Sequence, residues 1–205
     1  GEYLSRVQKL MPLCLTALSG GSKDNAIPRS CQATVVAMGI GIERINGIAA
    51  ALQKEIREKY DEPDALVQAF DVDALGGNSL TTAATADVIS LLCAAPNGVQ
   101  SYSADIPGLV QTSLNLGVCH LGDQFTATFS VRSSVNREKE ELLQQLRDLT
   151  AFYKGTYSQA GAYPAWEYRK DSPLRDTMVR VYQQMFGKDP QVLAIHAGLE
   201  CGLLG

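Results

Sequence analysis

The chain has 205 residues, of which 45% are hydrophobic and 20% are charged, which is ordinary for a globular protein with its own core. Its net charge of -4 argues against nucleic acid as a partner, because phosphate contacts need clustered Lys and Arg side chains. No apolar run approaches the ~20 residues of a membrane span, and the first residues lack the layout of a secretion signal. We therefore expect neither a membrane protein nor an exported one.

The five cysteines indicate a cytoplasmic protein. They are odd in number and widely spaced, and each lies in an apolar stretch: Cys14, Cys31, Cys93, Cys119 and Cys201. This pattern favours reduced, buried thiols in the cytoplasm over a disulfide framework.

Helices and strands alternate in the first part of the chain. Apolar residues recur at helical spacing over residues 2–18, with a kink or break expected at Pro12. A strand is expected over residues 31–38, and an amphipathic helix over residues 43–60. The apolar run at residues 65–72 predicts another strand.

The pattern then partly restarts. The GGN of residues 76–78 opens a helix, which the PNG of residues 96–98 ends. Two strands over residues 110–119 and 124–132, joined by a short turn with a glycine, predict a hairpin. A charged helix follows over residues 136–153.

A loop–strand–helix–strand unit is thus expected twice, near residues 25–75 and near residues 110–160, with residues 156–160 as the last strand. Strands mixed with helices and joined by hairpins indicate an α+β fold, with helices on one face of mainly antiparallel sheets. The two ferredoxin-like units share little sequence, so the repeat is one of architecture only.

Beyond residue 160 the composition changes, and the sequence becomes rich in aromatic residues and typical of a loop. Ser172 and Pro173 then form an N-cap and first position of a helix that Gly187 ends, and a short strand is expected over residues 191–195. This helix carries an apolar stripe of Leu174, Met178, Val181, Tyr182 and Met185. A soluble protein rarely leaves such a stripe bare, so we expect another copy of the chain to cover it.

The chain closes on HAGLECGLLG, which brings possible chemistry together. On a helix, the spacing of His196 and Glu200 would suit a pair of metal ligands. Glycines interrupt the segment, however, and His120 lies far away in sequence, whereas a zinc site needs three or four ligands. A structured loop after a strand is the alternative. Cys201 as a nucleophile would need a nearby base.

Two other polar residues have a functional and a plain interpretation. Arg132 closes the polar side of a strand, and its planar fork suits a carboxylate ligand, although a strand-end arginine on a solvated face is the simpler case. Asn25 lies in the DNAIPR loop, either shaping its own turn or hydrogen-bonding a substrate.

Five stretches, in chain order, resemble segments of the bacterial aminoacyl-histidine dipeptidases (peptidase D), of the two-metal aminoacylase and carboxypeptidase superfamily. They are GGSKDNAIPR, APNGV, TSLNLGV, GAYPAW and HAGLECGL. The resemblance runs from about residue 20 to the end of the chain, and HAGLECG with GAYPAW upstream is its most specific part.

In that family an inserted lid domain of this length splits a catalytic domain. The resemblance implies a lid over residues 1–160 and a returning catalytic segment over residues 161–205. It also implies two zinc ions bridged by water, a glutamate that takes the water's proton, and dipeptide substrates, notably those ending in histidine. The metal ligands and that glutamate have no counterpart here, so we expect a fragment that binds no metal and is inactive by itself.

Some site residues do carry over from the family. Arg132 matches the arginine implicated in holding the dipeptide's terminal carboxylate, and Asn25 matches the asparagine that contacts the backbone near the scissile bond. His196 and Glu200 match the loop that returns to the metal centre, near the active site, without being recognisable ligands. A homo-oligomer is the expected assembly. The competing interpretation is a stand-alone binding or dimerisation module with the lid fold and no catalysis.

Overall fold

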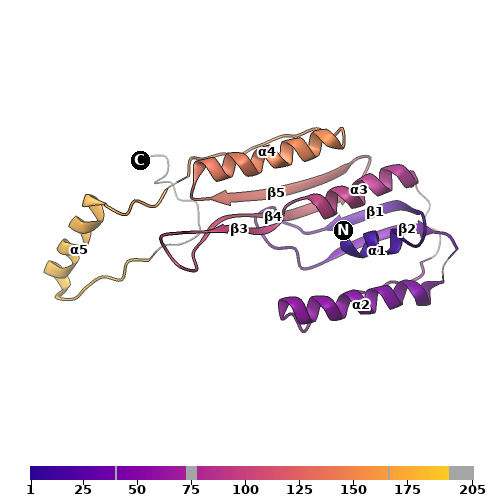
Figure 1. Cartoon of the computed structure of the whole chain (residues 1–205), viewed down its shortest axis with the longest axis horizontal. Coiled ribbons are helices and arrows are strands. Elements are labelled where there is room, and N and C mark those ends of the chain that lie inside the picture. Colours follow the sequence, from indigo (N-terminus) through magenta and orange to yellow (C-terminus); the bar gives the residue numbers. More distant parts are fainter. Residues whose placement is uncertain (40, 73–77, 166, 194–205) are drawn as a thin grey trace. The chain divides into compact units, whose positions relative to one another are not determined.

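The computed structural model describes residues 1–39, 41–72, 78–165 and 167–193, and these form helices and strands in mixed order (Figure 1). The helices are α1 (Glu2–Gln8), α2 (Ile42–Tyr60), α3 (Thr82–Ala94), α4 (Asn136–Phe152) and α5 (Pro173–Phe186). The strands are β1 (Leu13–Gly20), β2 (Cys31–Ala37), β3 (Gly98–Tyr102), β4 (Val110–Leu121) and β5 (Phe125–Ser133).

The strands hydrogen-bond in the order β2-β1-β4-β3, and β5 also pairs with β4. The pairs β1–β2, β1–β4 and β3–β4 are antiparallel, so the expected α+β fold with a mainly antiparallel sheet is confirmed. The chain divides into two compact units, to both of which β4 and β5 contribute. The first unit holds residues 1–96, 116–129 and 152–154; the second holds residues 97–115, 130–151 and those from 155 onward.

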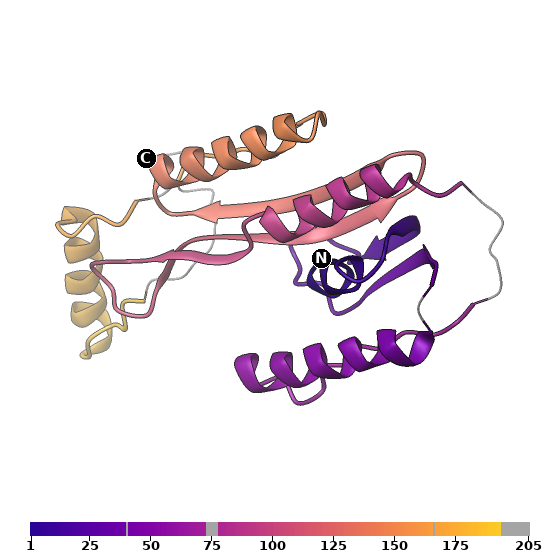
Figure 2. The same ribbon diagram turned by 45° about the vertical axis from the view of Figure 1, so that its right-hand side comes forward.

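The core of the first unit lies between short helices and the strand β1. Figures 1 and 2 both show α1 between α3 and α2. The buried apolar side chains come from α1, the turn after it, β1, α3 and the end of β4: Leu4, Val7, Met11, Leu13, Leu15, Leu18, Val88, Ile89, Cys119 and Leu121. The buried hydroxyl of Thr85 in α3 accepts the backbone N–H of Leu15 at 2.9 Å, which ties the helix to the strand.

The helix expected over residues 2–18 is wrong beyond α1, because residues 13–20 form β1. The helix ends at Gln8, and Pro12, which has no N–H to donate and disfavours the helical conformation of the residue before it, keeps the helix from continuing, so the expected break is found. Leu13 and Leu15 then alternate into the core, as strand residues do. The pairing with β2 is irregular between Leu15 and Ala17, which turns Leu18 inward as well and produces the spacing that resembles a helix.

The strand expected over residues 65–72 is also wrong. The segment is extended but pairs with no strand, and side chains of α2 satisfy its backbone instead. Gln53 accepts the N–H of Val67 at 2.9 Å and Asn46 accepts the N–H of Ala69 at 3.0 Å. The apolar run therefore lies along a helix, with Phe70 69% exposed.

The second unit contains the strand β3, which the sequence pattern does not predict. It pairs with the first half of β4. The hairpin of β4 and β5 and the helix α4 are confirmed. No strand forms at residues 156–160, which run beside α4 and are held by side chains. Arg147 donates to the side-chain oxygen of Gln159 at 3.1 Å and lies over the ring of Tyr157.

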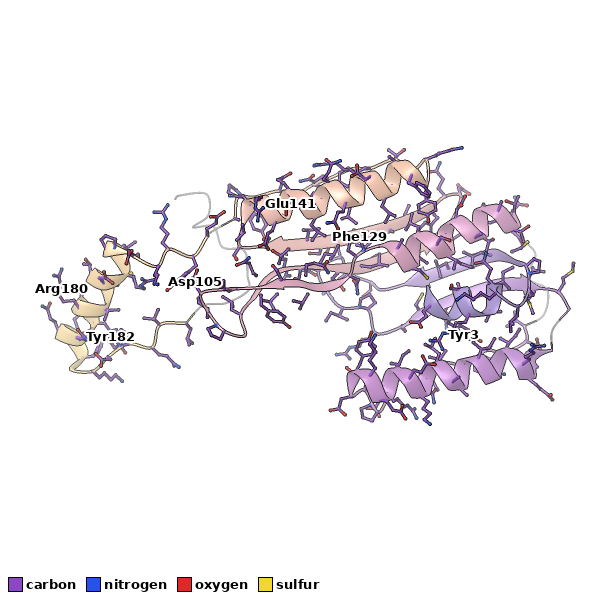
Figure 3. The ribbon with its side chains drawn as sticks, in the orientation of Figure 1. Tyr3, Asp105, Phe129, Glu141, Arg180 and Tyr182 are labelled. Carbon is purple, nitrogen blue, oxygen red and sulfur yellow. The ribbon has the colours of Figure 1, made fainter. Side chains whose placement is uncertain are left out.

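The helix α5 begins and ends as its capping residues predict. The Ser172 side chain accepts the N–H of Arg175 at 3.3 Å, and Gly187 adopts the left-handed conformation at the other end. Figure 3 marks Arg180 and Tyr182 on this helix, none of whose residues is buried in the single chain. Residues 191–193 of the expected final strand are not in a strand, and residues 194–195 lie outside the described part.

Candidate functional site

Asn25 lies in the loop of residues 21–30, which joins β1 to β2. Its side chain is exposed, and its backbone N–H donates to the carboxylate of Asp24 at 2.8 Å. The loop surrounds a shallow hollow of about 370 Å³, lined by residues 19–22, residues 26–30 and Gln32. The Asn25 amide is thus presented to solvent beside a hollow, as a ligand-binding side chain would be.

The backbone of this loop packs directly against the backbone of β4 at two glycines, Gly21 and Gly117. A Cβ at Gly117 would lie 2.1 Å from the carbonyl oxygen of Asp24, and one at Gly21 would lie 1.8 Å from the carbonyl oxygen of Gly117. Gly21 also has a φ of +74°, which side-chain-bearing residues rarely adopt. Backbone therefore meets backbone here, and this contact decides where the loop runs.

Arg132 lies near the end of β5 in the second unit and is half-buried. Its guanidinium makes no ion pair with any residue that the structure describes. A half-buried fork with no anionic partner among these residues is suited to receive a carboxylate from a ligand. Asn25 and Arg132 belong to different units, and each is placed within its own.

A network around Glu138 holds the strand end that carries Arg132. Glu138, in the first turn of α4, accepts Ser101 Oγ at 2.6 Å and Gln111 Nε2 at 2.6 Å, and also accepts the buried hydroxyl of Thr112. Thr112 Oγ1 in turn hydrogen-bonds Ser133 Oγ at 2.7 Å. Because neighbouring strand residues point to opposite faces, anchoring Ser133 in this network turns Arg132 to the other face.

Residues 161–165 of the GAYPAW stretch lie beside the same turn of α4. Asn136 accepts the backbone N–H of Ala165 at 2.9 Å, and Lys139 Nζ donates to the carbonyl oxygen of Tyr163 at 2.6 Å. Asn136, which holds this stretch, is only four residues from Arg132 in the chain.

The three hydroxyl and amide donors lower the pKa of Glu138, with Ser101 the largest cause. The carboxylate therefore stays charged in the folded state at a pH where the unfolded carboxyl, with a pKa of about 4.5, is protonated. Its stabilising contribution is complete above that range and is lost as the pH falls through the folded-state pKa.

We expect Glu138→Ala to lower the free energy of unfolding by about 2–3 kcal/mol at neutral pH, because the buried Thr112 hydroxyl and two half-buried donors lose a charged acceptor. Glu138→Gln should cost less and should flatten the loss of stability below pH 4.5, as measured by urea unfolding at several pH values. Glu141→Gln is the control, since the one ion pair that Glu141 (Figure 3) makes with a described residue is the exposed one to Arg137 on the same helix. Equal effects at both positions would contradict the role of the network.

The remaining chemistry-bearing residues are dispersed or undescribed. His196, Glu200 and Cys201 lie outside the described residues, and His120 is exposed on β4. Among the described residues, no three His, Cys, Asp or Glu side chains gather in a group that could hold a metal ion. Of the four described cysteines, all free, Cys31 and Cys93 are exposed, so the expectation of buried thiols is wrong for these two. No helix in the described ranges is long and apolar enough to cross a membrane.

The chain matches no protein-family model. It is 31% identical over 204 residues to the cytosol non-specific dipeptidase of Escherichia coli (strain K12), a match that covers 98% of this chain and 42% of the relative. It also matches the crystal structure of the aminoacylhistidine dipeptidase from Vibrio alginolyticus, with a TM-score of 0.83 and 27% identity. The chain is homologous to a segment of these dipeptidases.

The match with the solved dipeptidase again covers 98% of this chain and 42% of the other, so the chain spans less than half the length of both relatives. The resemblance inferred from the five sequence stretches is therefore confirmed. The pattern did not reveal Glu138, although an acidic residue in the first turn of a helix that directly follows a strand was the available signal.

Proposed function

We propose that this chain is the substrate-covering part of a cytoplasmic dipeptidase, with a lid domain over residues 1–160 and a returning catalytic segment over residues 161–205. The observation that carries the proposal is the match of nearly the whole chain, in sequence and in structure, to a segment of two dipeptidases. Dipeptides, notably those ending in histidine, are the substrates. Peptide-bond hydrolysis is the reaction.

Within that reaction Arg132 binds the terminal carboxylate of the dipeptide. Its planar guanidinium can donate two parallel hydrogen bonds to a carboxylate, which fixes the orientation as well as the charge of the ligand. Asn25 donates its side-chain amide toward the carbonyl oxygen of the scissile bond, where negative charge develops. The exposed position of Asn25 and the lack of an ionic partner for Arg132 among the described residues support these roles.

The family resemblance implies zinc in the whole enzyme. The described residues do not fit that group, because they bring no three potential ligands together, so no step assigned to them passes through a metal. We place the activation of water in parts of the enzyme outside the described residues. His196 and Glu200 are proposed to lie close to that centre without binding the metal.

The isolated chain is expected to hydrolyse no dipeptide and to retain no stoichiometric zinc, since a zinc site needs at least three protein ligands. The measurement is a hydrolysis assay with an aminoacyl-histidine substrate, together with metal analysis after gel filtration. Metal-dependent turnover that survives repurification would sink this assignment. Turnover by the longer polypeptide with matching flanks, and not by this chain, would support it.

We further propose that the apolar stripe of α5 docks on a second copy of the chain. Leu174, Met178 and Met185 are 72%, 65% and 69% exposed, and each large apolar side chain gains roughly 1.5–3 kcal/mol on full burial. Met178→Glu should therefore shift the sedimenting species to lower mass, while Gln184→Glu on the same helix should not. An unchanged mass for Met178→Glu counts against this partner and favours cover by another part of a longer polypeptide.

A further inference from the structure

Two thiols converge on one point of the first unit. Gly20, the last residue of β1, pairs with Cys31 of β2 on one side and with Cys119 of β4 on the other. A Cβ at Gly20 would lie 2.9 Å from Cys31 Sγ and 3.1 Å from Cys119 Sγ. The two sulfur atoms thus share the space that a side chain at residue 20 would occupy.

The pair is also reachable. Cys31 is exposed, and Cys119 is buried behind it, within hydrogen-bonding reach of the Cys31 sulfur. A small ion can therefore reach the exposed sulfur of Cys31 from solvent and bind the sulfur of Cys119 next to it.

The spacing of strands decides what these thiols can hold. Neighbouring strands lie about 4.8 Å apart, so Cα atoms on β2 and β4 with β1 between them are separated by roughly 9.6 Å. A disulfide needs Cα atoms within about 6.8 Å, and the direct bond is therefore too short for this pair. A cation that binds two thiolates at about 2.3 Å each bridges a sulfur–sulfur separation of up to roughly 4.6 Å. This suits two neighbouring thiols that are too far apart to form a disulfide.

We propose that Cys31 and Cys119 form a two-thiolate binding site for a soft monovalent cation of the copper(I) class. Thiolates select soft cations, and zinc would need two further ligands that the described residues do not bring to this point. Binding replaces two S–H bonds with two S–Cu bonds and releases two protons, with no transfer of electrons. The bound ion would cross-link β2 to β4 at the base of the loop that carries Asn25.

The test uses the full chain without oxygen, with copper(I) supplied as its acetonitrile complex. Alkylation followed by peptide mass spectrometry should show Cys31 protected by one equivalent of copper(I) and unprotected with magnesium. Cys93, exposed on α3, should remain open to alkylation in both cases. Alkylation of Cys31 at the same rate with and without copper(I) would overturn the proposal in the unmodified protein, without any variant.

Variants then assign the ligands by competition with a chromophoric copper(I) chelator. Cys31→Ser and Cys119→Ser should each weaken binding on the order of 100-fold, because the second thiolate binds intramolecularly. Gly20→Ala should also weaken binding while keeping both thiols, since its methyl group fills the shared space. Cys93→Ser is the matched control. Wild-type affinity in either single thiol variant, or an equal loss in Cys93→Ser, would refute a two-thiolate site.

Discussion

In the longer dipeptidase to which we propose that this chain belongs, Arg132→Ala is expected to reduce kcat/KM for free dipeptides roughly 30- to 700-fold, which corresponds to about 2–4 kcal/mol of lost binding energy. Without the half-buried Arg132 guanidinium, the substrate carboxylate would lose its ion pair and remain partly desolvated. Arg132→Lys should not restore the rate, because a point charge cannot replace a planar fork with two parallel donors. Steady-state kinetics of the three proteins with one dipeptide provides the measurement.

The matched control is Arg137→Ala, since the Arg137 side chain is 80% exposed and lies on the neighbouring helix α4. Dipeptide amides, which lack the terminal carboxylate, should be hydrolysed alike by wild type and Arg132→Ala. Normal kinetics of Arg132→Ala with free dipeptides would show that the role inferred for this arginine is wrong. An equal loss with the amide would point to damage of the fold instead.

Gly117→Ala is expected to have the largest effect on stability, about 3 kcal/mol or more, because its methyl group would enter the backbone of Asp24. Neither the strand β4 nor the loop can give way alone, since each contact is between main chains. The free energy of unfolding from urea titration measures the loss. In the proposed longer enzyme kcat/KM should fall as well, because the displaced loop carries Asn25, the proposed substrate-binding residue.

Gly47→Ala provides the opposite case within the same unit. Gly47 lies inside α2 with open space where its Cβ would be, and alanine is the better helix former. This variant should gain about 0.5–1 kcal/mol. A Gly117→Ala protein as stable as wild type would mean that the loop of residues 21–30 does not rest on β4 as described.

Much of the helical structure could be predicted because its determinants are local. An apolar stripe predicts the long helices α2 and α4, and the capping residues Ser172 and Gly187 also predict α5. The β4–β5 hairpin follows from clean alternation on either side of a short turn. The resemblance to dipeptidases likewise rests on short stretches of neighbouring residues, which is why it could be recognised without a structure.

Strand assignments failed where the backbone finds its partner far along the chain. An extended apolar run such as residues 65–72 can pair with a strand or lie along a helix, and only the side chains of α2 decide between them. Residues 13–20 show the reverse, since an irregular pairing with β2 gives a strand the spacing of a helix. Periodicity records which side chains are buried, and the partner that buries them is a tertiary fact.

The same distinction holds for the candidate sites. The sequence by itself determined the resemblance to dipeptidases, and from it came the prediction that Asn25 and Arg132 bind the substrate. Only the tertiary structure brought Glu138 to the distant Ser101 and Thr112, and Cys31 to the distant Cys119. The residue type determines the chemistry of a side chain. Its neighbours across a sheet depend on strand register, which no local pattern in this chain specifies.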